Sequence, residues 1–178
     1  DAAWARGLRF RMGGVLETQL DELRAALDAY VHVANQDPAD LEAAKAVIRV
    51  AGKTARWDAA ARALVEATRA RDVLERTLVE AVEEAALAAT GWDAITFEVA
   101  SLIHDGGGLA PGLARDLEEA VAIWHRDRRG DPDAAEAAYS RALSHDPTNA
   151  PLLAELAKLQ RRARGRPLVD SLLRLSQT

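Results

Sequence analysis

The stretch Ala135–Pro147 reads AEAAYSRALSHDP, and its spacing is typical of a short helix packed against other helices. Ala135, Tyr139 and Ala142 follow one another at steps of four and three, so they share one helix face. The two small alanines allow a neighbouring helix to approach closely, and the tyrosine fills the space between them. Pro147 ends the helix, because its ring excludes the helical conformation at the residue before it. The stretch therefore predicts the second helix of a helix–turn–helix unit.

The same steps recur along the chain. Ala26 begins a copy that keeps every step through to Pro38, and Ala60 begins a copy that keeps the first two. Weaker copies begin at Ile95 and Val169, so the starting positions recur at intervals of about 34 residues, with one longer step before Ala135. A second mark agrees, because Trp-Asp-Ala stands directly before both Ala60 and Ile95. Two independent marks in one register indicate a repeated structural unit.

This pattern resembles the tetratricopeptide repeat, whose second helix ends in A-x3-F…P and whose period is about 34 residues. The resemblance implies an all-α fold in which about five antiparallel helix pairs stack into one right-handed superhelical solenoid over residues 1–178. The implied repeat units are 1–38, 39–71, 72–112, 113–148 and 149–178. HEAT-like and Sel1-like hairpins fit less well, because the spacing stays close to the tetratricopeptide period. Since the sequence starts at Asp1 without Met, we expect it to be a segment of a longer chain.

Helical periodicity and the positions of Gly and Pro predict where the helices lie. The expected helices are Ala3–Arg11, Leu16–Asn35, Asp40–Ala51, Trp57–Arg71, Asp72–Ala89, Trp92–His104, Leu113–Arg128, Asp133–His145, Asn149–Arg162 and Pro167–Leu175. Gly13 and Gly14 are expected to end the first of them. The longest step between repeats contains Asp105–Gly112, DGGGLAPG, which predicts a flexible inserted loop. The short connections between the helices imply antiparallel neighbours.

The composition excludes several classes of protein. The absence of Cys excludes disulfides, thiolate metal sites and a cysteine nucleophile. The net charge of −5 argues against general nucleic-acid binding, which needs a basic surface. No run of about 18 apolar residues is present, so we expect no membrane span.

No motif predicts a catalytic, cofactor or metal site. Gly52-Lys53-Thr54 resembles the end of a P-loop, but that motif needs another Gly where Val47 stands, so a helix end is the favoured interpretation. Gly106–Gly108 offers backbone amides that could hold an anion, although a flexible loop is favoured. The four histidines lack metal-ligand spacing. We therefore expect no enzymatic activity, no cofactor and no metal.

The resemblance to tetratricopeptide repeats implies that the chain binds another protein or a peptide, with the first helices of the units lining a concave face. The residues that it implies for partner binding are Lys45, Arg49, Trp124, Arg128, Lys158, Arg161 and Arg162. It also places Lys53, Glu80 and Glu84 towards this face. Arg49 stands where some members of the family have the Asn of a carboxylate clamp, so we do not expect capture of a C-terminal carboxylate.

The basic C-terminal third gives the most specific expectation about the partner. Arg128, Arg161 and Arg162 fall on the first helices of successive units, with Trp124 one turn before Arg128. Guanidinium groups pair with carboxylates, and a Trp supplies an apolar anchor beside them. We therefore expect an acidic segment of a partner at this end. Self-association through the open ends of the solenoid is a further expectation.

Three other functions stay open at this point. A purely structural segment of a larger multidomain protein is consistent with the apolar stretch Leu168–Leu175, because a solenoid end needs a polar cap. An RNA-binding helical repeat has a similar period but is disfavoured by the acidic total charge. An enzyme with catalytic residues in its groove would need convergent His and carboxylate side chains, which the sequence does not bring together.

Overall fold

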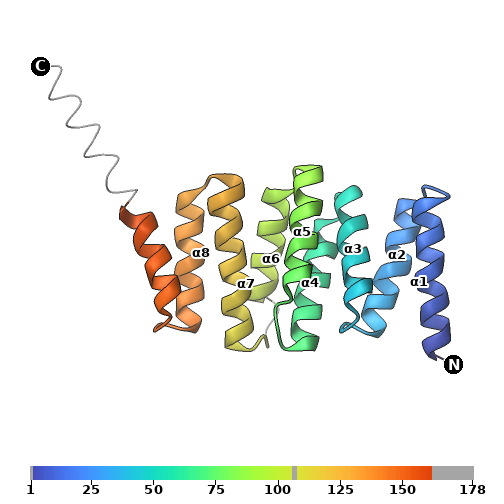
Figure 1. Ribbon diagram of the computed structural model, residues 1–178, viewed down its shortest axis with the longest axis horizontal. Helices are drawn as coiled ribbons and strands as arrows, with labels where there is room; N and C mark the ends of the chain where they lie inside the picture. Colours follow the sequence, from blue (N-terminus) through green and yellow to red (C-terminus); the bar gives the residue numbers. More distant parts are fainter. Residues whose placement is uncertain (1, 106–107, 162–178) are drawn as a thin grey trace, which may run out of the picture. The chain divides into compact units, whose positions relative to one another are not determined.

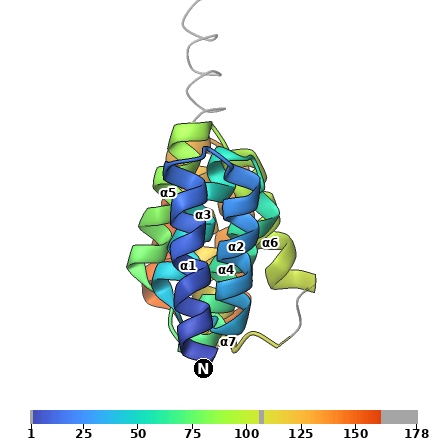
Figure 2. The same cartoon turned by 90° about the vertical axis from the view of Figure 1, so that its right-hand side faces the viewer.

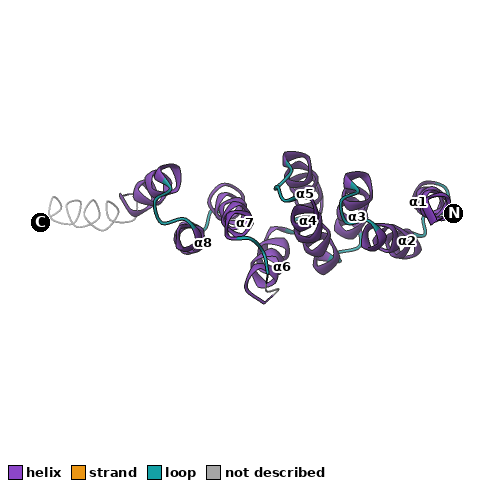
Figure 3. Ribbon diagram, turned by 90° about the horizontal axis from the view of Figure 1, so that it is seen from below, coloured by secondary structure: helices purple, strands orange, loops and turns teal. Residues whose placement is uncertain are grey.

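The computed structural model describes residues 2–105 and 108–161, and all regular structure within these ranges is helical (Figures 1 and 3). The all-α prediction is therefore confirmed for this part of the chain. The elements are α1 (Ala2–Thr18), α2 (Leu23–Gln36), α3 (Leu41–Lys53), α4 (Trp57–Arg71), α5 (Arg76–Ala89), α6 (Trp92–Asp105), α7 (Pro111–Trp124), η1 (His125–Arg129) and α8 (Pro132–His145). A further helix occupies residues 150–161. The expected helix Pro167–Leu175 and the repeat copy at Val169 lie outside the described residues.

The chain divides into two compact units, Asp1–Leu113 and Ala114–Thr178. The first contains α1 to α6, and the second contains most of α7 together with η1, α8 and the helix at 150–161. Both have large, fully buried apolar side chains, such as Ile48 and Leu64 in the first and Leu117 and Leu152 in the second.

Successive helices of the first unit pack on one another. α1 packs against α2, α2 against α3, α3 against both α4 and α5, and α4 against α6. Figure 2 shows α1 and α2 side by side, as a short connection between them requires. Eight of the 13 residues of α3 are buried, against three in α5, so α3 is the central helix of this unit. Asp40 caps its start, because the aspartate side chain accepts hydrogen bonds from the backbone N–H groups of Glu42 and Ala43.

The repeated starting positions lie on α2, α4, α6 and α8. All four that fall within the described residues are completely buried, and they are Ala26, Ala60, Ile95 and Ala135. Trp57 is buried as well, and its indole lies so close to the backbone of Gly91 that no side chain would fit there. Trp57 is therefore a packing residue between α4 and the start of α6.

The predicted boundary of the first helix is wrong. α1 continues through Gly13 and Gly14 to Thr18, and α2 begins at Leu23 rather than at Leu16. An added Cβ at Gly13 would lie 2.8 Å from Cε1 of Tyr30, so this glycine is needed for the close approach of the Tyr30 ring. Phe10 contacts the same ring, with a centroid separation of 5.3 Å and an interplanar angle of 58°. The glycine pair therefore marks helix packing, not a helix end.

The predicted inserted loop is shorter than expected. α6 extends to Asp105 and α7 already begins at Pro111, where proline fits the first helical turn. Gly106 and Gly107, which carried the expectations of flexibility and anion binding, lie outside the described residues.

The second unit contains a change of helix type that the sequence analysis missed. α7 continues into the π-helical turn η1, which is followed by Gly130 in the left-handed conformation at φ 64°. Asp131 then caps α8, since its carboxylate accepts a hydrogen bond from the backbone N–H of Ala134. A π turn holds one residue more than an α turn, so it rotates the side chains that follow.

Candidate protein-binding groove

A groove of about 710 Å³ lies between α3 and α5 in the first unit. Its central lining consists of small side chains, because Gly52 and Ala85 bring the two helices close together. The lining residues are Lys45, Arg49, Gly52, Lys53, Thr77, Glu80, Ala81, Glu84, Ala85, Ala88 and Ala89.

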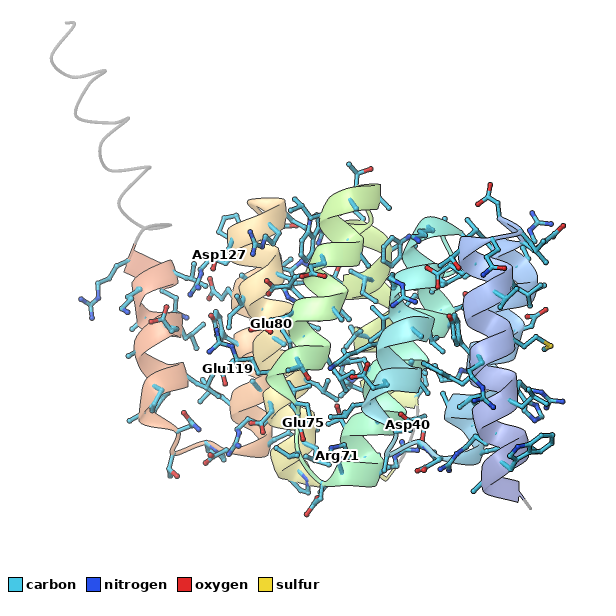
Figure 4. All side chains as sticks on the ribbon, turned by 45° about the vertical axis from the view of Figure 1, so that its right-hand side comes forward. Asp40, Arg71, Glu75, Glu80, Glu119 and Asp127 are labelled. Carbon is cyan, nitrogen blue, oxygen red and sulfur yellow. The ribbon has the colours of Figure 1, made fainter. Side chains whose placement is uncertain are left out.

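The two walls of this groove carry opposite charges. Lys45, Arg49 and Lys53 recur at every fourth position on α3, which places them in one row along the helix. Glu80 and Glu84 form the matching row on α5, where Figure 4 shows Glu80. The sequence analysis placed all five residues on one face, and the structure brings them together around one groove.

A buried carboxylate stands behind the basic wall. The side chain of Glu17 on α1 is only 5% exposed, and it holds both Arg49 and Lys53. Its Oε1 accepts hydrogen bonds from Arg49 Nε at 3.0 Å and Lys53 Nζ at 2.8 Å. Its Oε2 accepts from Arg49 Nη2 at 2.7 Å and from the hydroxyl of Tyr30 at 3.2 Å. Helices α1, α2 and α3 are thus joined through one carboxylate.

These hydrogen bonds shift the pKa values of the groups involved. The bidentate hydrogen bond from Arg49 and the one from Lys53 lower the pKa of Glu17 to about 2, although burial alone would raise it. The same contact raises the pKa of Arg49. Burial, followed by the charge of Glu17, raises the pKa of Tyr30. The Glu17–Arg49 pair therefore stays ionised at neutral pH, with Tyr30 neutral as a hydrogen-bond donor.

The remaining wall residues make weaker contacts at the surface. Lys45 pairs with the exposed Glu42 at 3.0 Å, and Arg76 pairs with Glu80 at 2.8 Å. Such exposed pairs contribute little stability and separate easily. Lys45 and Glu80 therefore make only such surface pairs, whereas Arg49 and Lys53 also have a structural role.

Glu17 and Tyr30 are the members of this site that the sequence analysis missed. In the repeat copy that begins at Ala26, Tyr30 occupies the packing position of Tyr139. The signal for Glu17 was its place as the sole acidic residue in the segment between Asp1 and Asp21. The predicted helix break at Gly13 concealed it, because it placed Glu17 in a different helix.

The expectation about Trp124 is wrong. Its side chain is completely buried, so it cannot offer an exposed apolar anchor to a partner. Arg128, Lys158 and Arg161 are exposed, whereas Arg162 lies outside the described residues. Trp124 ends α7 immediately before the π turn that contains Arg128.

A second pocket, of about 550 Å³, lies near these cations within the second unit, but acidic groups balance much of its charge. Arg126 pairs with Asp127 at 2.7 Å and with Glu155 at 2.8 Å, and Glu155 also binds Lys158. The hydrogen bond to Asp127 raises the pKa of Arg126, and that from Lys158 lowers the pKa of Glu155. The described part of the basic C-terminal third is therefore a mixed surface, not a uniformly positive one. Asp127 and Glu119 appear in Figure 4 on this part of the chain.

No three His, Asp or Glu side chains within 2–105 and 108–161 gather in a way that could hold a metal ion. Gly52 and Lys53 form the last turn of α3, and Thr54 caps it, so the helix end is confirmed and the P-loop interpretation is excluded. No helix in these ranges has the length and apolar character needed to cross a membrane.

Comparison with known proteins gives no relative, because no protein-family model, curated protein or solved structure matches the chain significantly.

Proposed function

We propose that this chain is a tetratricopeptide-like helical repeat that binds a segment of another protein in the groove between α3 and α5. The supporting observation is the groove itself, with a basic row on one wall, an acidic row on the other and a floor of Gly and Ala between them. The recurrence of buried starting positions on α2, α4, α6 and α8 supports the repeat assignment. The proposed superhelix would place such grooves between successive first helices.

The groove dimensions favour a short extended segment. Lys45 and Lys53 are two wall residues separated by just over two turns of α3, which corresponds to roughly 12 Å along the helix axis. An extended peptide rises about 3.3 Å per residue, so roughly four residues would lie between the charged walls. Acidic side chains on one edge of the segment would face Lys45, and basic side chains on the other edge would face Glu84. The partner is therefore a peptide segment that carries both signs of charge.

A display library of random short peptides, selected on the immobilised full chain, tests this proposal. The groove variant Lys45→Glu with Glu84→Lys exchanges the wall charges and leaves the net charge unchanged. The matched control is Arg24→Glu with Asp28→Lys, two exposed residues of α2 outside the groove. The selected peptides should bind the groove variant about tenfold more weakly or worse, and the control as tightly as the parent.

Two results would count against the groove. Selected peptides that bind the groove variant as tightly as the parent would place recognition elsewhere on the chain. A library that yields no peptide enriched over a blank surface would indicate a structural segment of a larger protein instead. The structural segment is the second candidate, because the cluster around Glu17 joins three helices without any partner.

A further inference from the structure

Helix α1 carries a row of exposed apolar side chains. Trp4, Leu8, Met12 and Val15 follow one another at steps of four, four and three and are 65%, 47%, 49% and 42% exposed. These steps keep all four on one side of the helix, within on the order of 80° of its circumference. We call this set the α1 stripe. Figure 2 shows α1 in front of the other helices of the first unit.

The α1 stripe lies away from the face by which α1 packs against the rest of the first unit. That packed face contains Phe10 and Gly13 against Tyr30, and Glu17 against Arg49. A helix that covers a core on one side normally exposes polar residues on the other. Isolated exposed apolar side chains are common, but a continuous row of this length marks a contact surface. α1 therefore has the pattern of a helix packed between two neighbours.

Apart from the buried Glu17, the charged side chains of α1 that the structure describes are all positive. Arg9 and Arg11 are exposed, and no carboxylate among the described residues lies within ion-pair distance of either. Arg6 is held by Asp37 at 2.7 Å, and the only carboxylate on α1, that of Glu17, is buried and engaged. This basic face stands out on a chain whose net charge is −5. Acidic side chains on a partner would complement it.

The same charges argue against a second copy of this chain as the occupant. In a symmetric antiparallel pairing of two α1 helices through the stripe, Arg9 of one copy would lie near Arg9 of the other, and Arg11 near Arg11. Like charges placed together at an interface oppose association. The narrow width of the α1 stripe also argues against a membrane surface, which binds a broad apolar face. Trp4, Leu8 and Met12 recur at every fourth position, and such a row is a ridge that fits between side chains of another helix.

We propose that the α1 stripe is the docking site for an acidic amphipathic helix of a partner protein. The apolar residues of the partner helix would pack on Trp4, Leu8 and Met12, and its Asp or Glu side chains would pair with Arg9 and Arg11. This surface is separate from the groove between α3 and α5, and neither proposal depends on the other.

The test uses the full chain and two synthetic helical peptides that differ only in charge. Both contain Leu at the spacing of the α1 stripe and lack Trp, and one has Glu at the flanking positions where the other has Lys. Binding is followed by the anisotropy of a dye on the peptide. Trp4 provides a second readout, because it is exposed whereas Trp57 and Trp124 are buried and Trp92 is half-buried, and covering it shifts its emission to shorter wavelength. The Glu peptide should bind at least about tenfold more tightly than the Lys peptide at low salt.

Variants then test the residues of the α1 stripe and its border. Leu8→Gln with Met12→Gln should weaken binding of the Glu peptide about tenfold or more. The matched control is Leu87→Gln with Phe97→Gln, because both residues are exposed apolar side chains of the same unit outside the stripe. Arg9→Glu with Arg11→Glu should reverse the preference, so that this variant binds the Lys peptide more tightly. That gain of binding also shows that the variant is folded.

Four outcomes would overturn the proposal. The first two are equal binding of both peptides, and no binding of the Glu peptide to the parent chain. The third is a concentration-dependent dimer in sedimentation velocity that Leu8→Gln with Met12→Gln abolishes, since this would assign the α1 stripe to a second copy. The fourth is a Trp4 emission shift that occurs with anionic phosphatidylglycerol vesicles but with neither peptide. This result would assign the α1 stripe to binding a membrane surface.

Discussion

The buried carboxylate of Glu17 holds two exposed cations of the groove, Arg49 and Lys53, in place. Its folded-state pKa of about 2 lies below the ordinary value of 4.5, so its ionised form stabilises the fold. This contribution is fully present above about pH 4.5 and is lost as the pH falls towards 2. A shift of this size corresponds to on the order of 3 kcal/mol in the free energy of unfolding. Glu17→Gln should therefore flatten the acid side of the stability profile, measured by urea unfolding between pH 2 and pH 7.

The control for this prediction is Glu42→Gln, which removes a carboxylate that is 75% exposed and, within the described residues, forms an ion pair only with Lys45. Such a surface pair contributes at most about 1 kcal/mol. Glu42→Gln should leave the acid dependence nearly unchanged. If Glu17→Gln and the parent lost stability in parallel on acidification, the pKa of Glu17 would have to lie near its ordinary value.

Replacing Gly13 or Gly7 of α1 with Ala should change stability in opposite directions. Gly13→Ala would bring a methyl group to 2.8 Å from the Tyr30 ring, and we expect a loss of about 1–3 kcal/mol of stability from this overpacking. Gly7 has no neighbour within 4 Å of an added Cβ, so Gly7→Ala should gain up to about 1 kcal/mol from helix propensity. Thermal unfolding of both variants measures the difference. Equal effects of the same sign would contradict the packing of Tyr30 on Gly13.

At the scale of the helix, Ala135 tests the packing of α8. Ala135 is completely buried, whereas Ala137 on the same helix is exposed. Ala135→Leu should overpack the second unit and cost about 1–3 kcal/mol, and Ala137→Leu should change stability by less than about 0.5 kcal/mol. Denaturant unfolding monitored by circular dichroism measures both. An Ala135→Leu variant as stable as Ala137→Leu would show that the site can expand without strain.

The helices were predictable from sequence where local signals and packing agree. The predicted helix Trp57–Arg71 matches α4, because the residues that its apolar periodicity places on one face are the ones that pack against other helices. α1 was mispredicted because Gly13 was interpreted by its backbone freedom, while its actual role is to accommodate the Tyr30 ring of the next helix. η1 was missed because a π turn has no local sequence signal of its own and depends on how the segment packs.

The candidate site was predictable only in part. The α3 row of Lys45, Arg49 and Lys53 follows from helical spacing, and the repeat register placed Glu80 and Glu84 on the same face. The contacts of Glu17 were not predictable, because they join α1 to α3 between positions far apart in the sequence. Trp124 was misassigned, because spacing alone cannot decide whether an aromatic on a first helix faces a neighbour or a partner.

At the scale of the whole molecule, the division into two units has a measurable consequence. The first unit contains α1 to α6, with its own core around the central helix α3 and with the salt bridges of Glu17 entirely inside it. α1 to α6 contact one another in succession, so a fragment that keeps these contacts should keep its fold.

A fragment of residues 1–105, which ends with α6, should therefore fold alone. It keeps the packing of α3 on α5 and of α4 on α6, together with the buried Ile95 and Val99. We expect a helical circular-dichroism spectrum and one cooperative urea transition. A shorter fragment of residues 1–71 removes α5 and α6, exposes the sides of α3 and α4 that they cover, and should unfold at lower urea. A 1–105 fragment without a cooperative transition, or no more stable than 1–71, would mean that the first unit depends on the second for its core.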